Sequence, residues 1–244
     1  MKIIVTDLTK FKNDGLVCLA GINPDTGACI RPFLTNKDPR GTYINFEDIR
    51  KHKIIPGSIL EGDFKERSPK KIPHSEDNFV SSLKIYGNST SEDFQKVLEI
   101  NSFRSISDGF GSTPINKSFT HENVPKKSII TLKINNPRNN FSLYIDDKFP
   151  PPSFKARIRD EDGFELNFLK VTDLGFLKQL ERIQNDDPQS LKLNSFLKRQ
   201  EALYLRIGLS QLWAPNKVEA PAYWLQLNGI YSFPDFREDL RIYE

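Results

Sequence analysis

Residues 15–34, "GLVCLAGINPDTGACIRPFL", contain two short apolar segments that flank a turn. The segments carry Val17, Ile22, Ile30 and Phe33, residue types that favour pleated strands. The "NPDTG" between them places Pro, Asp and Gly where a tight turn needs them. The stretch therefore predicts a β-hairpin, and the β-branched, apolar "KIIVTDL" before it predicts a further strand.

The second half of the chain repeats this order of elements. "SIITLKI" and "FSLYIDD" are strand-like, and Asp162-Gly163 marks a second hairpin. The clearest helix of the first half begins near Ser91, the expected N-cap, and a longer helical stretch follows in the second half. Long parallel βα alternation and a glycine-rich strand-to-helix loop are both missing, which argues against a doubly wound nucleotide fold or a TIM barrel. We predict a mainly β fold with minor α: two OB-like small β-barrels, each with an intervening helix, at residues 1–125 and 126–244.

Composition narrows the class of protein. The formal net charge of +3 and the pI of about 8.7 are mildly basic, which permits a phosphate-bearing partner without demanding one. Cys18 and Cys29 make no disulfide framework and are expected to be two small buried thiols. No apolar run approaches the ~18 residues of a membrane span, and the N-terminus lacks the pattern of a signal peptide. We expect a soluble cytoplasmic protein with no cofactor.

The segment "IPHSED" at residues 72–77 holds the candidate catalytic residues His74, Glu76 and Asp77. His74 has the chemistry of a general base that Asp77 could orient. The three side chains could instead bind a divalent metal, although ligands so close in sequence need a tight turn to point inward, and we assign no metal site. The favoured interpretation is structural: Pro73 stiffens a loop whose carboxylates cap a backbone segment or pair with lysines.

Two arginines lie on strands beside residues that suit a binding surface. Strand alternation places Arg31 on one face with Phe33, where the guanidinium could grip phosphate and the ring could stack on a base. The alternative is a buried arginine that pairs with Asp7 or Asp63. Arg206 has a similar setting, because Gly208 two residues later marks a bulge or a close approach of a ligand.

The last strands combine aromatic and amide side chains. Alternation puts Trp224, Gln226 and Asn228 on one face, and Trp213 lies nearby in sequence. Stacking surfaces and hydrogen-bond donors on one sheet face are what the reading of single-stranded bases requires. For any single aromatic residue here, burial in the core is the simpler alternative.

Three cationic side chains alternate with apolar ones along one expected strand. Lys155, Arg157 and Arg159 share a face, which gives the clearest electrostatic footprint in the chain. An anionic partner such as a phosphate backbone would neutralise them. The alternative is that Glu161 and Glu165 of the hairpin partner neutralise them across the strands.

Several stretches together resemble the dual OB-containing domain family of bacterial proteins. They begin at Asp7, Val17, Ile72, Leu205 and Trp224 and read "DLTK", "VCLAGINPDTGACIRP", "IPHSED", "LRIGLSQLW" and "WLQLNGIYSFPD". The resemblance implies two OB-like barrels that bind nucleic acid or nucleotides, often in prokaryotic defence against phage, and no established reaction. Gln211 departs from the basic residue expected after "RIGLS", which removes one expected phosphate contact.

Three hypotheses follow for the function. The leading one is a module that binds nucleic acid, expected to be single-stranded DNA or RNA, or a nucleotide, in an antiphage defence system. The second is a metal-dependent nuclease or nucleotide hydrolase centred on His74, Glu76 and Asp77, but the sequence has no P-loop, nucleophile elbow or zinc pattern, which favours a protein that is not an enzyme. The third is an adaptor that recruits a partner effector protein through an exposed apolar surface.

Overall fold

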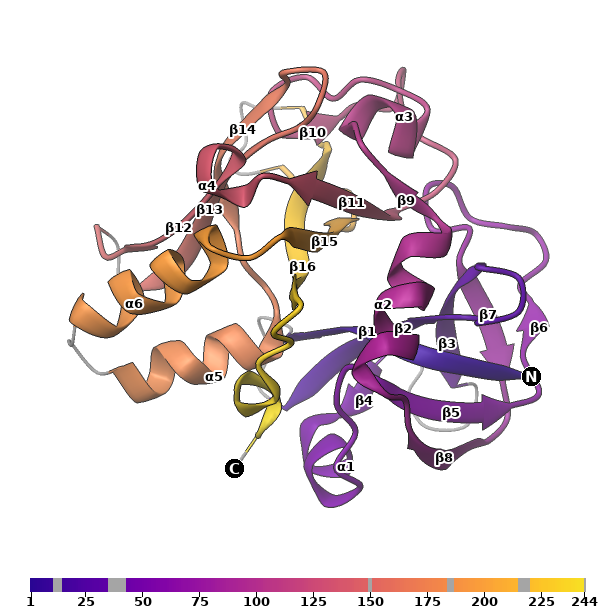
Figure 1. The fold of residues 1–244 in the computed structure, drawn as a ribbon. Helices are drawn as coiled ribbons and strands as arrows, with labels where there is room; N and C mark the ends of the chain where they lie inside the picture. The colour runs from indigo at the N-terminus through magenta and orange to yellow at the C-terminus, as the bar shows by residue number, and fades with distance from the viewer. Residues whose placement is uncertain (11–14, 35–42, 149–150, 184–186, 215–219, 244) are drawn as a thin grey trace.

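The computed structural model describes residues 1–10, 15–34, 43–148, 151–183, 187–214 and 220–243, and it is mainly β as predicted (Figure 1). The N-terminal half forms one curled sheet in which only β3 and β7 run parallel. Its order is β6 (Lys65–Glu66), β7 (Asp77–Val80), β3 (Cys29–Leu34), β2 (Leu16–Ile22), β1 (Lys2–Lys10), β5 (Ser58–Gly62) and β8 (Leu83–Asn88), with β4 (Tyr43–Asn45) also paired to β2.

The hairpin predicted at residues 15–34 is confirmed by the antiparallel pair β2–β3. The side chain of Asn23 holds its turn, because Oδ1 accepts hydrogen bonds from the backbone N–H groups of Asp25 at 3.0 Å and Thr26 at 2.8 Å. Gly27 closes the turn with a φ of 71°, a conformation that glycine adopts without strain. Both cysteines are free thiols, but they are half-buried instead of fully buried.

Two further sheets enclose the largest apolar core. The five-stranded sheet has the order β10 (Ser118–Phe119), β16 (Tyr223–Phe233), β15 (Ala202–Leu209), β11 (Ile129–Asn135) and β9 (Ser102–Phe103). The three-stranded sheet has the order β12 (Phe141–Asp146), β13 (Ser153–Arg159) and β14 (Glu165–Lys170). A bridge between Val171 and Leu227 joins the sheets after β14, so that together they curl around one core as a small barrel.

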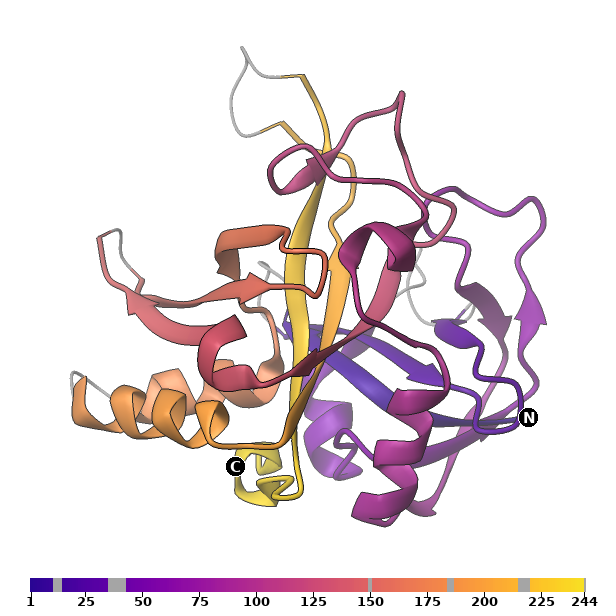
Figure 2. The same cartoon turned by 45° about the horizontal axis from the view of Figure 1, so that its top comes forward.

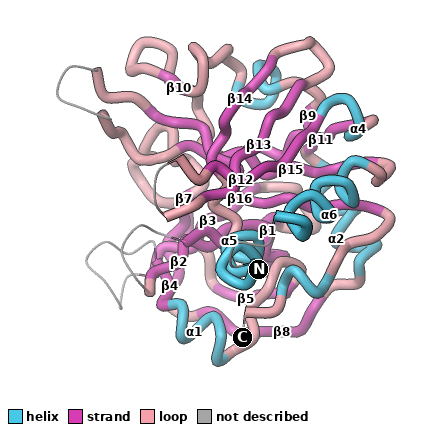
Figure 3. Tube along the Cα trace, turned by 90° about the vertical axis from the view of Figure 1, so that its left-hand side faces the viewer, coloured by secondary structure: helices cyan, strands magenta, loops and turns pink. Residues whose placement is uncertain are grey.

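Short helices complete both halves (Figure 3). The helix expected near Ser91 is α2 (Ser91–Ile100), but its N-cap is Thr90, whose Oγ1 accepts a hydrogen bond from Asp93 N at 3.1 Å. The helical stretch of the second half is split into two helices that pack on the barrel core. The helices are α1 (Phe46–Lys51), α2, α3 (Ile106–Phe110), α4 (Pro137–Asn140), α5 (Leu174–Ile183), α6 (Asp187–Lys198) and the 3₁₀ helix η1 (Glu238–Arg241).

The two halves exchange elements across the expected boundary at residues 125 and 126. Strands β9 and β10 precede that boundary but pair with β11 and β16 of the second barrel. In the opposite direction, Tyr243 near the C-terminus joins the apolar cluster of Ile3 and Val5 in the first half. Each half thus contributes elements to the other, and the boundary between residues 125 and 126 stays a prediction.

None of the helices in the described residues is long and apolar enough to span a membrane.

Candidate functional site

The "IPHSED" segment is buried at Pro73, His74, Glu76 and Asp77, and it ties the two halves together. His74 is 1% exposed, and its Nδ1 lies 2.9 Å from Ser128 Oγ just before β11. Because the Ser128 hydroxyl donates to Glu76 Oε2 at 3.1 Å, it must accept a hydrogen bond from Nδ1–H of His74. Burial lowers the pKa of His74 to about 3, so the imidazole is neutral at neutral pH, and its buried Nε2 has no hydrogen-bond partner among the described residues.

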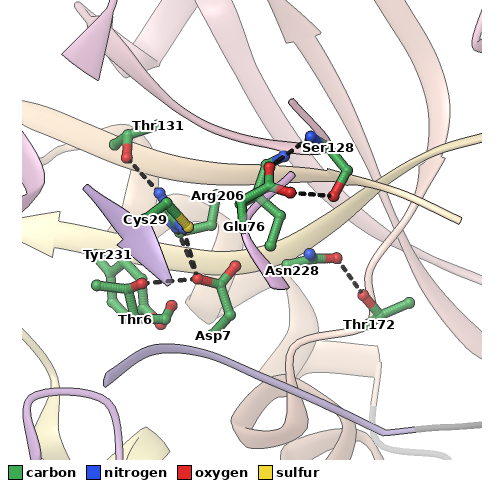
Figure 4. A network of polar contacts seen from close by, with 11 residues as sticks. Thr6, Asp7, Cys29, Glu76, Ser128, Thr131, Thr172, Arg206, Asn228 and Tyr231 are labelled. Atoms are coloured by element: carbon green, nitrogen blue, oxygen red, sulfur yellow. Dashed lines mark hydrogen bonds and ion pairs between the residues drawn. The ribbon is translucent and has the colours of Figure 1, made fainter. Parts of the chain in front are cut away.

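Glu76 caps the start of β11 (Figure 4). Its Oε1 accepts hydrogen bonds from the backbone N–H groups of Ser128 at 2.5 Å and Ile129 at 2.8 Å. Burial raises the pKa of this carboxyl group, and these N–H groups together with Arg31 oppose the shift. Both carboxylate oxygens are thus engaged in holding one barrel against the other.

Arg31 and Asp77 form a buried ion pair along β3 and β7. The Arg31 Nε lies 2.6 Å from Asp77 Oδ1, and Arg67 approaches Asp77 Oδ2 at 3.3 Å. Arg31 therefore pairs with Asp77 instead of Asp7 or Asp63. Phe33 is half-buried and packs edge-on against Phe79, with the Arg67 guanidinium 5.0 Å from its ring centre. Arg31 is thus buried and engaged by a carboxylate.

Arg206 is buried in a second network between the halves (Figure 4). Its guanidinium contacts Asp7 Oδ2 at 2.8 Å, Thr131 Oγ1 at 2.7 Å and Cys29 Sγ at 3.2 Å. Nearby, Tyr231 donates its hydroxyl hydrogen to the Thr6 carbonyl at 2.6 Å. Burial raises the pKa of the Cys29 thiol to about 12, which keeps the thiol protonated despite the neighbouring guanidinium.

The described residues contain no group of three or more His, Cys, Asp or Glu side chains that could hold a metal ion. Of the two carboxylates, Glu76 caps a backbone segment as the structural interpretation expected, whereas Asp77 pairs with Arg31 and Arg67 instead of lysines.

The cationic residues of β13 lie on the outer face of the second barrel. Lys155 is half-buried, whereas Arg157 and Arg159 are exposed, and the residues between them point into the core. Glu165 lies 2.8 Å from Arg157 and 3.9 Å from Arg159, so one carboxylate serves two guanidinium groups. In Figure 2 this three-stranded sheet lies on one side of β16 and the strands of the first half lie on the other. The cationic face therefore points away from the interface between the halves.

Phe168 presents its ring on the same outer face. The register shifts between Ala156 and Ile158, so that Arg157 lies opposite two residues, Asn167 and Phe168, in a β-bulge. Phe168 has a φ of 57°, which is strained for a bulky side chain and is the conformation that glycine takes in one class of bulge. Its ring is 57% exposed and meets Tyr144 at right angles, with 5.8 Å between ring centres.

Lys117 connects this face to the tryptophans at the end of the β15–β16 hairpin. It precedes β10, whose Ser118 pairs with Trp224, and its carbonyl accepts a hydrogen bond from Leu225 N at 2.8 Å. Burial lowers the pKa of Lys117, and the positive charge of Lys155 lowers it further.

Trp213 and Trp224 lie together at this end of the molecule. Trp213 is 57% exposed, and its carbonyl accepts a hydrogen bond from Nε1 of the half-buried Trp224 at 3.0 Å. Gln226 is half-buried on the same face of β16, as strand alternation predicted.

The model of the dual OB-containing domain family matches residues 1–230. The chain belongs to this family. No curated protein and no solved structure gives a match. OB-folds commonly bind nucleic acid, with a sheet face and the barrel loops as the contact surface. In this dual OB-containing protein, the outer face of the three-stranded sheet is a described surface that joins several cations to exposed rings.

The sequence patterns identified only part of that surface. Strict alternation from Glu165 would place Phe168 inside the dual OB barrel, whereas the bulge turns its ring outward. The signal that could have revealed it is the spacing of Leu166 and Leu169, because two buried leucines three residues apart do not fit a regular strand. Tyr144 was missed because only the pairing of β12 with β13 brings it beside Lys155.

Proposed function

We propose that the outer face of the second barrel binds single-stranded nucleic acid. The observation that carries the proposal is Phe168, a bulky exposed aromatic residue in a left-handed conformation beside Tyr144. Such strain persists where the surroundings impose it, and it concentrates at ligand-binding sites. Glycine would relieve the strain but would remove the ring. An aromatic ring retained there supports stacking on a base.

The charges around Phe168 support phosphate binding. Among the outward-facing residues of β13 and β14, Glu165 is the one carboxylate, and it lies beside the cations Arg157 and Arg159 of the row that begins at Lys155. Exposed pairs such as Glu165 with Arg157 contribute about 0–1 kcal/mol, so phosphate can compete for the guanidinium. Backbone phosphates on these cations would leave the bases free to stack on Phe168 and Tyr144.

Lys117 extends this surface toward Trp213. A single-stranded nucleic acid bound at Lys155 could continue to Lys117 and then to the exposed Trp213 ring. This ring offers a further stacking surface. Aromatic rings stack on any base, and the cations contact only the phosphate backbone of the nucleic acid. We therefore expect little sequence preference. Duplex binding should be weaker, because paired bases are not available for stacking.

Fluorescence anisotropy with labelled single-stranded DNA, RNA and duplexes tests the proposal. Four phosphate contacts, at Lys117, Lys155, Arg157 and Arg159, predict a slope of about −3 in a plot of log affinity against log salt, or about a 50-fold loss between 50 and 200 mM salt. The double change Arg157→Glu, Arg159→Glu should reduce the slope to about −1.4 and weaken binding.

The matched control is Lys51→Glu, Lys84→Glu, which changes the net charge equally. Both lysines are exposed: Lys51 ends α1 and Lys84 lies on β8, and both elements belong to the first half (Figure 1). Equal loss of affinity in both double variants would mean that net charge alone attracts the nucleic acid. Retention of full affinity in the β13 variant, with its fold intact by circular dichroism, would place the contact elsewhere.

We also propose that this binding serves defence against phage, as the resemblance to the family implies. The same β13 double variant tests this in cells that carry the complete defence system, where plaque counts should rise to the level of cells without it. Protection that is unchanged in the variant would separate the nucleic-acid surface from defence.

A further inference from the structure

A pocket of about 260 Å³ lies between the two halves, apart from the cationic face of β13. The β2–β3 turn, the loop at residues 72–77, β9 and β11 form its walls. Its volume is just below the range of about 300–1,000 Å³ that is usual for small-molecule sites, so it has room for one small ligand. Ile22, Phe103 and Ile129 supply apolar wall, as the body of an organic ligand requires.

The polar wall of the pocket is rigid. Arg206 lines it, and the contacts of its guanidinium with Asp7, Thr131 and Cys29 fix the orientation of its remaining N–H donors. Asn101 donates its amide hydrogen to the Gly27 carbonyl, which leaves its Oδ1 as an acceptor. Donors and acceptors are thus held in place before a ligand arrives, which lowers the entropy cost of binding.

Side chains of both charges line the pocket. Glu76 is 5% exposed and contributes a carboxylate to the inner wall, which disfavours a bare anion there. Lys127 is half-buried, and its ammonium lies 4.7 Å from the ring centre of Phe103. Within the described residues, no ion pair engages Lys127. A matching ligand has a neutral body with hydrogen-bonding edges and one anionic group directed at Lys127.

We propose that this pocket binds one nucleotide, with its base at the inner wall and its phosphate at Lys127. The inference rests on the proposed function for the class of ligand, but it uses separate residues. The nucleotide could be free or could be the phosphorylated end of a strand, and both present the same chemical unit to the pocket.

Calorimetric titration of the full chain with nucleoside monophosphates, nucleosides and inorganic phosphate tests the inference. We expect at least one nucleoside monophosphate to bind and Lys127→Ala to weaken it about tenfold or more, as loss of a charged hydrogen bond does. The neighbouring Lys126→Ala is the matched control, because Lys126 is exposed and does not line the pocket. Affinity for the nucleoside should not change in Lys127→Ala.

A second variant blocks the pocket without touching its buried network. Ala28 is exposed and lines the pocket, so Ala28→Phe should fill it and abolish mononucleotide binding while the protein stays folded. Absence of mononucleotide binding to the native protein would overturn the inference. Equal affinity of the Lys127→Ala and Lys126→Ala variants, or full affinity of Ala28→Phe, would also overturn it.

The two proposals fail separately. If oligonucleotides bind through Arg157 and Arg159 but mononucleotides do not bind, only the proposal for the pocket is refuted. If mononucleotides bind through Lys127 but oligonucleotides do not bind, only the proposal for the outer face of the second barrel is refuted. A dinucleotide with a 5′-phosphate identifies the source of the ligand: competition with the mononucleotide would show that strand ends enter, and its failure would assign the pocket to free nucleotides.

Discussion

The buried His74 predicts that the protein loses stability in mild acid. Burial lowers the pKa of His74 to about 3 from its ordinary value of 6.5, Arg31 and Lys71 lower it further, and Asp77 opposes them. Below pH 6.5 the unfolded chain therefore binds a proton that the folded protein does not take up until about pH 3. Since the unfolded state is favoured by that proton, stability falls as the pH falls through this window.

The size of the effect follows from the gap in pKa. Each pH unit below 6.5 costs about 1.36 kcal/mol, so at pH 5 the loss from His74 is about 2 kcal/mol, whereas at pH 7.5 it is close to zero. This figure depends only on the ordinary pKa of histidine, provided that the folded value lies well below 5. It is a large fraction of the stability of a typical domain.

Urea unfolding at pH 7.5 and pH 5, followed by circular dichroism, measures the effect. The comparison protein is His74→Asn, whose amide nitrogen can still donate to Ser128 but does not titrate. Glu76 and the other carboxyl groups titrate in both proteins, so the difference between their free energies of unfolding isolates His74. We expect that difference to shift by about 2 kcal/mol in favour of the variant at pH 5. A difference that is the same at both pH values would refute a neutral, buried His74.

Three other changes are predicted. Phe168→Gly relieves the left-handed backbone strain, so it should raise the free energy of unfolding by about 1 kcal/mol in thermal unfolding. The same variant should weaken oligonucleotide binding, because the ring is lost. The control for the stability effect is Tyr144→Ala, which relieves no such strain. Arg206→Met should lower the free energy of unfolding, measured in urea, by about 3–5 kcal/mol, because the buried Asp7 loses its ion-pair partner. The double variant with Asp7→Asn should recover part of this loss. Cys29 should react with iodoacetamide at pH 8 far more slowly in the native protein than in urea, since its thiol pKa of about 12 keeps it protonated; equal rates would contradict that value.

Local patterns in the sequence predicted local structure well. The β2–β3 hairpin and the β13–β14 hairpin at Asp162-Gly163 were predictable because a few turn residues define each of them. Helix α2 was predictable from its apolar spacing, although the N-cap proved to be Thr90, one residue before Ser91. Both residue types cap helices well, so spacing alone could not distinguish the two positions.

Partners distant in sequence were not predictable from the same patterns. Arg31 pairs with Asp77 because β3 and β7 run side by side in parallel, a pairing that joins segments 46 residues apart. Arg206 pairs with Asp7 across 199 residues, and nothing near either residue in the sequence indicates its partner. The cationic spacing on β13 was readable, but its relation to Phe168 depends on a bulge that breaks strand alternation.

The same distinction separates the charged residues that hold the fold together from those available for binding. Arg31, Glu76 and Arg206 had the sequence settings of binding residues, yet each is buried and engaged by a partner across the sheets. A buried ion pair loses stability when one partner is removed, so a variant at these positions would lose binding through unfolding. Arg157 and Arg159 have the opposite character, because solvent already surrounds them and charge reversal leaves no buried group unpaired. Loss of binding can therefore be attributed to a contact with nucleic acid at β13, whereas the same loss at Arg206 would report on the fold.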